Sequence, residues 1–565
     1  MSARVASAPS AAALKRVFWA VLGVTLAFRL WLAWWFPLTG DEAYFVHWGE
    51  APALGYYDHP PLVGWLLAAL VELSRAKLAL RLPAVVLPAL VAIGIAWLVR
   101  DLAATGREPG TGAEALGYAT ALAWLLVPAQ VLNIAITTDT PLAFFSFLSL
   151  AAFALGVQRA SGAFASPRPS PDGAEGGETR AARRQSVALF AASGVALGLA
   201  FLSKYFAVML GVGYLVFTVL VPRRGRWRDL AIVLAAAAPF ALVNAAWNYA
   251  HCWANLLHNV YNRDTSGGWH KPLVFAGLLL YVSSPLLLWQ LARGARAVRA
   301  AAVRPAVAAI AACALAPLAV LAVASPFKTI GLHWLLSFMP ALFMTGAFAL
   351  GAGALAGSAR FLAGFSALHV VLVAALAALP VETWQWVRKY SSLVEAVHAD
   401  EVLAVLRPYE GKFVFASNSY SSAATLSYHG AARGFVARPG VPDDPRAAWR
   451  RHYFVVFGPG SGHGRQDDLR TDFRRLDGAD ILVLRKTPAA REEYAPLFRS
   501  VELRDVAVRG AAFQLVLGRG FDAAAYRDRV LALVRERHYR IPGYLPQGRC
   551  YICERYFGAA TCPAP

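Results

Sequence analysis

The sequence predicts an α-helical polytopic membrane protein that carries a C-terminal soluble α/β domain. The chain of 565 residues is 58% hydrophobic and only 16% charged, with a mean hydropathy of +0.47, which is far too apolar for a soluble protein of several domains. Residues 1–380 contain repeated apolar runs of about the length that crosses a bilayer. Residues 381–565 lack such runs and mix strand-like with helical patterns.

The apolar runs predict about 11–13 transmembrane helices, because each crossing needs roughly 20 mostly apolar residues. We place eleven crossings at residues 17–36, 82–100, 115–132, 140–157, 187–203, 205–221, 230–249, 272–292, 305–324, 333–352 and 361–380. A shorter run at 61–76 is followed by three basic residues and is predicted as an interfacial helix. Counting short runs of this kind as crossings gives the higher total.

Basic residues set the predicted orientation. The formal net charge of +20 is not taken as a nucleic-acid signal, because basic residues of a membrane protein collect in cytoplasmic loops. The Arg-rich stretches 158–186, 223–228 and 293–304 are therefore predicted inside, and the first of them, rich in Gly, Pro and Ser, reads as a flexible linker. This topology gives a transmembrane domain at 1–380 and leaves an α/β domain at 381–565 on the outer face of the membrane. No cleavable signal peptide is expected.

The five cysteines are too few for a disulfide scaffold. Cys550 and Cys553 form a CxxC pair with Cys562 nearby, and a structural disulfide is favoured over a redox pair or a zinc site. Cys313 reads as a small apolar residue within a span. Arg29 lies in the first apolar run, where an unpaired charge is costly, so we expect it to have an interior partner.

The candidate active site is the stretch 37–65, PLTGDEAYFVHWGEAPALGYYDHPPLVGW. It sets carboxylates and imidazoles among aromatic residues on the predicted outer face, where ionisable groups near hydrocarbon are costly unless they are used. Other predicted outer loops add polar residues, among them Asp139, Lys204, Lys328 and His333. Carboxylates for proton abstraction beside cations for an anion suit a donor that is a phosphate on a lipid.

Five motifs carry a resemblance to a known family. They are GDEAYF at 40–45, YYDHPPL at 56–62, TTDTPLAFF at 137–145, GLAFLSKY at 198–205 and SPFKTIGLHWLLSFMPAL at 325–342. In order and spacing they resemble the GT-C polyprenyl-phosphate-dependent glycosyltransferases, in the group of the protein O-mannosyltransferases and the lipid A aminoarabinose transferases. The run SNSYSSAATLSYH at 417–429 looks, more loosely, like part of the outer domain of bacterial members.

The resemblance implies an inverting transfer of a sugar from undecaprenyl phosphate to a cell-envelope lipid or glycan at the periplasmic face. Asp41 matches the acidic residue that would take the proton from the acceptor hydroxyl, with Glu42 and Asp139 as further catalytic candidates. Substrate-binding roles are implied for Tyr57, Asp58, His59, Lys204, Lys328 and His333. The cofactor stays open: no metal-ligand spacing is seen, although a divalent metal assists some members of the group.

Each candidate also has a plain structural interpretation. Thr39 to Glu42 reads T-x-x-E, so Glu42 is equally suited to cap a helix. Asp58 precedes His59 and two prolines and suits a turn. Asp139 precedes Pro141 as helix-starting residues do. Three further candidates suit the membrane interface, where lysines snorkel and aromatic belts lie: Lys204, Lys328 and His333.

Three other functions compete with the envelope glycosyltransferase. Transfer to Ser or Thr of a protein uses the same chemistry and fold. A transporter or flippase for lipid-linked sugars is disfavoured because no internal repeat is evident and the ionisable residues gather in outer loops. A receptor or assembly factor would tolerate changes in the Asp41 loop. The sequence does not choose the sugar, the acceptor or the oligomeric state.

Overall fold

The computed structural model describes residues 10–104, 110–165, 175–261, 268–441, 449–459 and 470–558. The chain forms two compact units that interleave along the sequence. Unit 1 comprises Met1–Trp34, Arg81–Val243 and Asp264–Ala374, and unit 2 comprises Trp35–Leu80, Asn244–Arg263 and Ala375–Pro565. Two segments that precede residue 380, Trp35–Leu80 and Asn244–Arg263, therefore belong to the same unit as the C-terminal part. The boundary at residue 380 between two functional domains stays a prediction.

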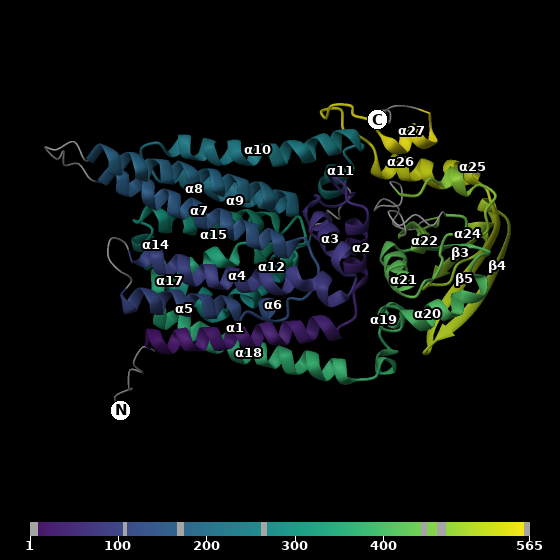
Figure 1. The fold of residues 1–565 in the computed structure, drawn as a ribbon, viewed down its shortest axis with the longest axis horizontal. Coiled ribbons are helices and arrows are strands. Elements are labelled where there is room, and N and C mark those ends of the chain that lie inside the picture. The colour runs from purple at the N-terminus through teal and green to yellow at the C-terminus, as the bar shows by residue number, and fades with distance from the viewer. Residues whose placement is uncertain are drawn as a thin grey trace. The chain divides into compact units, whose positions relative to one another are not determined.

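Unit 1 is helical throughout the part that the structure describes, and its long helices run lengthwise in Figure 1. Seven helices of the described residues are long and apolar enough to cross a membrane. They are α1 (Ala11–Trp35), α4 (Lys77–Ala103), α7 (Asp139–Ala165), α8 (Glu175–Ser203), α10 (Arg226–Ala250), α15 (Pro305–Ala324) and α18 (Ala352–Ala378). Helices α12 (Lys271–Ser283) and α13 (Pro285–Arg293) form an eighth candidate that is bent by 100°.

The remaining predicted crossings are shorter than expected. They correspond to α5 (Thr111–Leu125) with α6 (Pro128–Val131), to η1 (Tyr205–Ala207) with α9 (Val208–Leu220), and to α16 (Leu332–Leu336) with α17 (Met339–Leu350). A short helix α14 (Ala295–Ala301) follows α13. At 1.5 Å per residue, a helix of 12 residues such as α17 spans about 18 Å, less than the apolar core of a bilayer. Hydropathy therefore found each of these apolar runs but not the breaks within them.

The prediction of a flexible linker at 158–186 is wrong over most of its length. Helix α7 continues to Ala165 and α8 begins at Glu175, while residues 166–174 lie outside the described residues. The alanines and arginines on both sides are strong helix formers. They outweigh the polar composition that suggested a loop.

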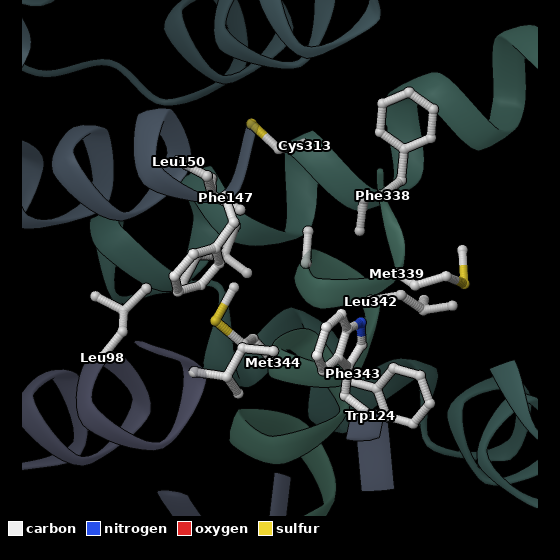
Figure 2. Packing of buried hydrophobic residues seen from close by; sticks show 14 of the residues in the cluster. Leu98, Trp124, Phe147, Leu150, Cys313, Phe338, Met339, Leu342, Phe343 and Met344 are labelled. Atoms are coloured by element: carbon white, nitrogen blue, oxygen red, sulfur yellow. The ribbon is translucent and has the colours of Figure 1, made fainter. Parts of the chain in front are cut away.

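The core of unit 1 is a continuous apolar cluster. Figure 2 shows Trp124, Phe147, Phe343 and Met344 among the side chains that fill it. Other large apolar side chains of the same helices point outward, and this exposed set includes Val24, Trp34, Leu220, Val323 and Leu368. Exposed apolar surface on this scale suits a protein that lipid surrounds.

Among the described residues, no interior partner for the charge of Arg29 is seen, although we expected one. Its side chain is fully buried in α1, and its Nε donates a 3.3 Å hydrogen bond to the carbonyl of Thr25, one turn earlier. The two terminal guanidinium nitrogens have no hydrogen-bond partner among the described residues.

Unit 2 holds the predicted α/β fold. Its sheet has the order β2-β1-β3-β5-β4, with β1 parallel to β2 and β3, and β5 antiparallel to β3 and β4. The strands are β1 (Val414–Ser417), β2 (Val455–Val456), β3 (Ile481–Arg485), β4 (Phe498–Val508) and β5 (Ala511–Phe521). The first three confirm the strand-like runs at 412–418, 453–458 and 480–486. Apolar side chains line both faces of the sheet.

The other elements of unit 2 are helices, and three of them come from early segments of the chain. The early ones are α2 (Gly40–Glu50), α3 (Leu62–Leu73) and α11 (Ala254–Val260). The later ones are η2 (Val381–Trp384), α19 (Tyr390–Val397), α20 (Ala399–Leu406), η3 (Arg407–Tyr409), α21 (Tyr420–Ala432), α22 (Trp449–His452), η5 (Phe473–Leu476), α24 (Arg491–Tyr494), η6 (Ala495–Leu497), α25 (Ala523–Tyr526), η7 (Arg527–Leu531), α26 (Ala532–His538) and α27 (Tyr551–Tyr556).

A disulfide joins two distant parts of unit 2. Cys550 is bonded to Cys252, 298 residues earlier, and not to its CxxC neighbour Cys553. Cys553 is disulfide-bonded as well, while Cys562 lies outside the described residues. Cys313 is free and buried in unit 1, as expected for an apolar role. The prediction of a structural disulfide is confirmed, while the participation of Cys252 was not predicted.

Candidate functional site

Asp41 stands in the first turn of α2, and its side chain is exposed. One of its carboxylate oxygens accepts a 2.6 Å hydrogen bond from the hydroxyl of Tyr420, the first residue of α21. The two helices approach closely because residue 40 is glycine: a Cβ there would lie 2.5 Å from the Cβ of Ser421. Asp41 is therefore held in the first turn of α2, beside the first turn of α21.

Glu42 has the capping role that the T-x-x-E pattern predicted. Its carboxylate accepts a 3.0 Å hydrogen bond from the backbone nitrogen of Thr39, whose hydroxyl in turn accepts from the Glu42 nitrogen. Burial of the Glu42 side chain is almost complete. The capping box is confirmed, while catalysis by Glu42 stays a prediction.

An aromatic bridge connects Asp41 to Asp58. Asp58 is buried and accepts a 3.1 Å hydrogen bond from the hydroxyl of Tyr44. The Tyr44 ring packs edge-on against the ring of Tyr420 at a centroid distance of 5.3 Å. The two aspartates of the stretch 37–65 are thus linked through two tyrosines, one of which comes from the C-terminal part of the chain.

Tyr57 and His59 lie in the same loop but have different surroundings. The ring of Tyr57 lies 5.1 Å from the ring of His258 and is buried. The His59 ring lies about 6 Å from Phe45 and Trp48, and its carbonyl accepts a hydrogen bond from the backbone of Tyr56. This backbone bond closes a turn over 56–59, as the Asp-His-Pro-Pro sequence predicted.

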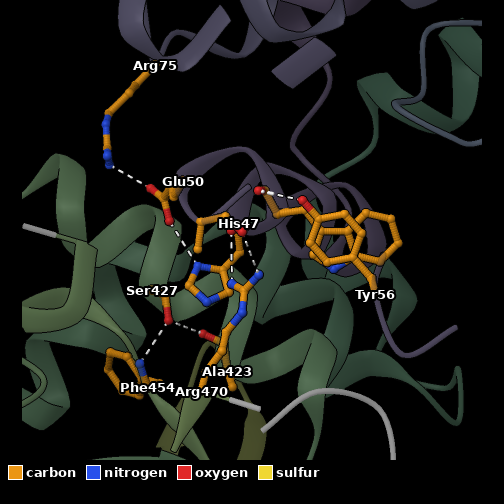
Figure 3. Close-up of polar contacts among 10 residues, drawn as sticks. His47, Glu50, Tyr56, Arg75, Ala423, Ser427, Phe454 and Arg470 are labelled. Carbon is orange, nitrogen blue, oxygen red and sulfur yellow. Dashed lines mark hydrogen bonds and ion pairs between the residues drawn. The ribbon is translucent and has the colours of Figure 1, made fainter. Parts of the chain in front are cut away.

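His47 and Glu50 form a second polar cluster on α2, together with two arginines (Figure 3). His47 Nδ1 lies 2.9 Å from a Glu50 oxygen, and the other Glu50 oxygen lies 2.8 Å from Arg75. Burial and the charge of Arg470 together lower the pKa of His47 to about 4, although the hydrogen bond to Glu50 acts to raise it. His47 is therefore neutral at pH 7.

The other predicted site residues belong to unit 1. Asp139 is the first residue of α7, as its position before Pro141 predicted, and accepts a 2.7 Å hydrogen bond from the ammonium of Lys204. Asp139 and His333 both line a cavity of about 240 Å³ that also contains Gln130 and Asn133. Lys328 is half-buried in the segment that follows α15. Asp139, Lys204 and His333 are therefore brought to one part of unit 1.

An apolar groove of about 400 Å³ lies between α8, α9 and α10. Its lining includes Phe201 and Ala207, which lie three residues before and after Lys204. The opposite side is formed by small and branched side chains of α10 such as Leu234 and Ala241. The groove therefore offers an apolar surface next to the segment that contains Lys204.

A cavity of about 730 Å³ in unit 2 was not expected from the sequence. Among the described residues, its lining contains the arginines 438, 450, 470, 475 and 555 and one acidic residue, Asp472. Tyr57 is the one predicted site residue among the described residues that line it. The arginines were missed because they lie in short runs such as AAWRRHYF, where nothing in the sequence distinguishes a cavity wall from a solvated surface.

The part of the chain that the structure describes contains no group of three His, Cys, Asp or Glu side chains that could hold a metal ion. We derive no metal-dependent step from these residues.

Comparisons with known proteins agree with the motifs. Residues 179–248, which include α10 and most of α8, match the family model of the dolichyl-phosphate-mannose-protein mannosyltransferases. The lipid A galacturonosyltransferase RgtD of Rhizobium johnstonii is 29% identical over 215 residues. That match covers 37% of this chain and 38% of RgtD, so it spans well under half of the relative.

The fold has a counterpart among solved structures. The crystal structure of ArnT from Cupriavidus metallidurans in the apo state superposes with a TM-score of 0.50 at 18% identity. The superposition covers 89% of this chain and 98% of that chain. Together with the two sequence matches, it confirms both the predicted resemblance and the predicted fold class.

Proposed function

We propose that this chain is a membrane glycosyltransferase of the GT-C type, since its fold is similar to that of ArnT and parts of its sequence match RgtD and the protein mannosyltransferase family. It moves a sugar from a polyprenyl-phosphate carrier, undecaprenyl phosphate in a bacterium, to a lipid or glycan of the cell envelope. The transfer inverts the configuration at the anomeric carbon.

The observation that carries the proposal is the position of Lys204. Its ammonium lies in the segment that matches the mannosyltransferase family and is bonded to Asp139. The residues on either side of it line the apolar groove. A polyprenyl phosphate has an anionic head on an apolar chain, so the groove would take the chain and Lys204 the phosphate. His333, on the cavity that Asp139 also lines, and Lys328 would assist.

Asp41 is the proposed general base. It would accept the proton of the acceptor hydroxyl while that oxygen forms a bond to the anomeric carbon and the carbon–phosphate oxygen bond breaks. Polyprenyl phosphate leaves as a stabilised anion and needs little protonation. The Tyr420 hydroxyl fixes the orientation of the Asp41 carboxylate without removing it from solvent. Tyr57, Asp58 and His59 would shape the acceptor site.

The disulfides support an orientation with unit 2 outside the cytoplasm. The bond between Cys252 and Cys550 needs an oxidising compartment, which the bacterial periplasm provides. The orientation agrees with the positive-inside rule for the Arg-rich turns. The proposed location is therefore the inner membrane, with the active site facing the periplasm.

Transfer of a radiolabelled sugar from polyprenyl-phosphate donors to total envelope acceptors tests the proposal. Asp41→Asn should lower transfer by roughly 100-fold or more, because general-base catalysis contributes about that much, while protein level and thermal midpoint stay close to wild type. Glu72→Gln, an exposed acidic residue of α3, is the matched control and should keep full transfer.

The products decide between the remaining candidates. Label in the lipid or glycan fraction supports the proposal, whereas label on protein favours protein O-glycosylation. Equal transfer by the wild type and by Asp41→Asn removes Asp41 from catalysis and turns attention to Asp139. Absence of transfer by both, with several donors, would favour a transporter of lipid-linked sugars.

A further inference from the structure

The large cavity of unit 2 has the size of a small-molecule site. Its volume of about 730 Å³ falls within the range of pockets that enclose drug-sized ligands, and it would take two or three sugar rings. All of its lining residues belong to unit 2. Neither Asp41 nor Asp139 lines it, whereas Tyr57, which we assign to the acceptor site, does.

The lining is strongly cationic. Its described residues include five arginines and one acidic side chain, Asp472, which accepts hydrogen bonds of 3.0 and 2.8 Å from Arg474. Asp472 also lies 3.8 Å from Arg475 of the lining, so its charge is shared between one arginine outside the cavity wall and one within it. Several positive charges that share one concave surface raise the local concentration of anions.

Arg438 is a partly buried arginine of this wall. Burial lowers the pKa of Arg438, Tyr453 raises it, and the neighbouring charge of Arg450 lowers it. A partly buried cation beside a second cation is costly unless an anion joins them.

Arg470 is held in place by backbone carbonyls at the C-terminal end of α2. Its guanidinium donates a 3.0 Å hydrogen bond to the carbonyl of His47 and a longer one to the carbonyl of Ala51, as Figure 3 shows for His47. It also lies 5.7 Å from the centre of the Trp449 ring, which Arg450 approaches at 5.5 Å. A guanidinium fixed in this way loses little conformational freedom when it binds an anion.

Aromatic rings form the rest of the wall. Trp48 stacks on Tyr56 at a centroid distance of 4.2 Å, and Trp247 stacks on His251 at 4.3 Å. All four residues line the cavity, together with Trp449. Flat rings that combine an apolar face with a polar edge suit the faces of sugar rings better than they suit a free inorganic ion.

We propose that this cavity binds an anionic saccharide, a sugar that carries phosphate or carboxylate groups, through the guanidinium groups of Arg438, Arg450 and Arg470. The inference rests on the proposed function only in identifying that saccharide with the acceptor. In that case unit 2 selects acceptors by their charge, and the selection is made by residues outside the transfer site.

Equilibrium binding to the full-length protein in nanodiscs tests this inference, with no sugar donor present. The probes are an N-acetylglucosamine disaccharide bearing two phosphate monoesters, the same disaccharide without phosphates, and inorganic phosphate. The bisphosphorylated disaccharide should bind at least tenfold more tightly than either of the others, with an affinity that falls as salt rises. Equal affinity for the neutral disaccharide, or for inorganic phosphate, would overturn the proposal.

Two variants locate the site. Arg438→Gln and Arg450→Gln should each weaken binding of the bisphosphorylated disaccharide about tenfold or more, since each removes a charge-assisted contact. Arg450 is exposed, so its replacement does not endanger folding. Arg529→Gln removes an exposed charge of the same unit away from the cavity and should leave binding unchanged. Unchanged binding in both cavity variants would overturn the assignment.

The result of the binding experiment does not depend on the result of the transfer assay. Binding that depends on Arg438 would persist even if the chain transferred no sugar, and the cavity would then belong to a different activity. Conversely, transfer that depends on Asp41, with binding that ignores Arg438 and Arg450, would uphold the proposed function and reject this site.

Discussion

Two adjacent acidic residues in the first turn of α2 have different tasks. Glu42 turns inward and satisfies the backbone nitrogen of Thr39, which would otherwise be left without a partner at the helix start. Asp41 points outward to Tyr420. Since the cap is made by Glu42, Asp41 is available for chemistry without cost to the helix. This division favours Asp41 over Glu42 as the base.

His47 makes the stability of unit 2 depend on pH. Its pKa is about 4 in the folded protein and near 6.5 when unfolded, so below pH 6.5 the unfolded chain takes up a proton that the folded chain does not. The free energy of unfolding should be unaffected above that pH and decrease as the pH falls toward 4, by about 1 kcal/mol at pH 5.5. Thermal midpoints at pH 7.5 and 5.5 measure this decrease, and His47→Asn should reduce it. An equal decrease in the variant would contradict the assignment to His47.

The sequence was informative for residues whose partners are close along the chain. The capping box at Thr39 and Glu42 and the helix start at Asp139 were predicted from patterns of three or four residues. The bonds from Lys204 to Asp139 and from Tyr420 to Asp41 cross 65 and 379 residues. Local spacing holds no information about such pairs, because tertiary folding alone brings them together.

At the scale of elements, the contact between α2 and α21 depends on Gly40. A Cβ at this position would lie 2.5 Å from the Cβ of Ser421, so Gly40→Val must push the two helices apart. The change should lower the stability of unit 2 by about 1–3 kcal/mol and break the bond between Asp41 and Tyr420, with a loss of transfer. Thermal unfolding and the transfer assay measure the two effects. Gly23→Ala, where a Cβ meets nothing within 4 Å, is the control; a stable, active Gly40→Val would contradict the close contact.

Strands and helices were predicted unequally. Apolar runs identified β1 and β3 because these strands are buried on both faces. The hairpin of β4 and β5 was missed, since β4 is largely exposed and its sequence alternates charged with apolar residues. Its turn, Arg509–Gly510, has positive φ at both residues, the geometry of a two-residue hairpin, but an Arg-Gly pair is a weak turn signal.

At the scale of the whole molecule, the disulfide ties an early segment of unit 2 to its C-terminal part. Cys252→Ser, Cys550→Ser and the double variant should lower the thermal midpoint equally, because each removes the same bond, worth roughly 2–5 kcal/mol. Thiol labelling of the single variants should reveal one new reactive cysteine. Additive losses in the double variant would show that the two residues act separately.

The same bond sets an order of events during synthesis. The chain passes five times between the two units, and the partner of Cys252 is 298 residues further along. The ribosome must therefore deliver residue 550 before the bond can close. Membrane insertion of the intervening helices thus precedes completion of unit 2, and until then the Cys252 thiol is open to the wrong partner. A cell that makes this protein depends on oxidation that acts late, after translation has passed both cysteines.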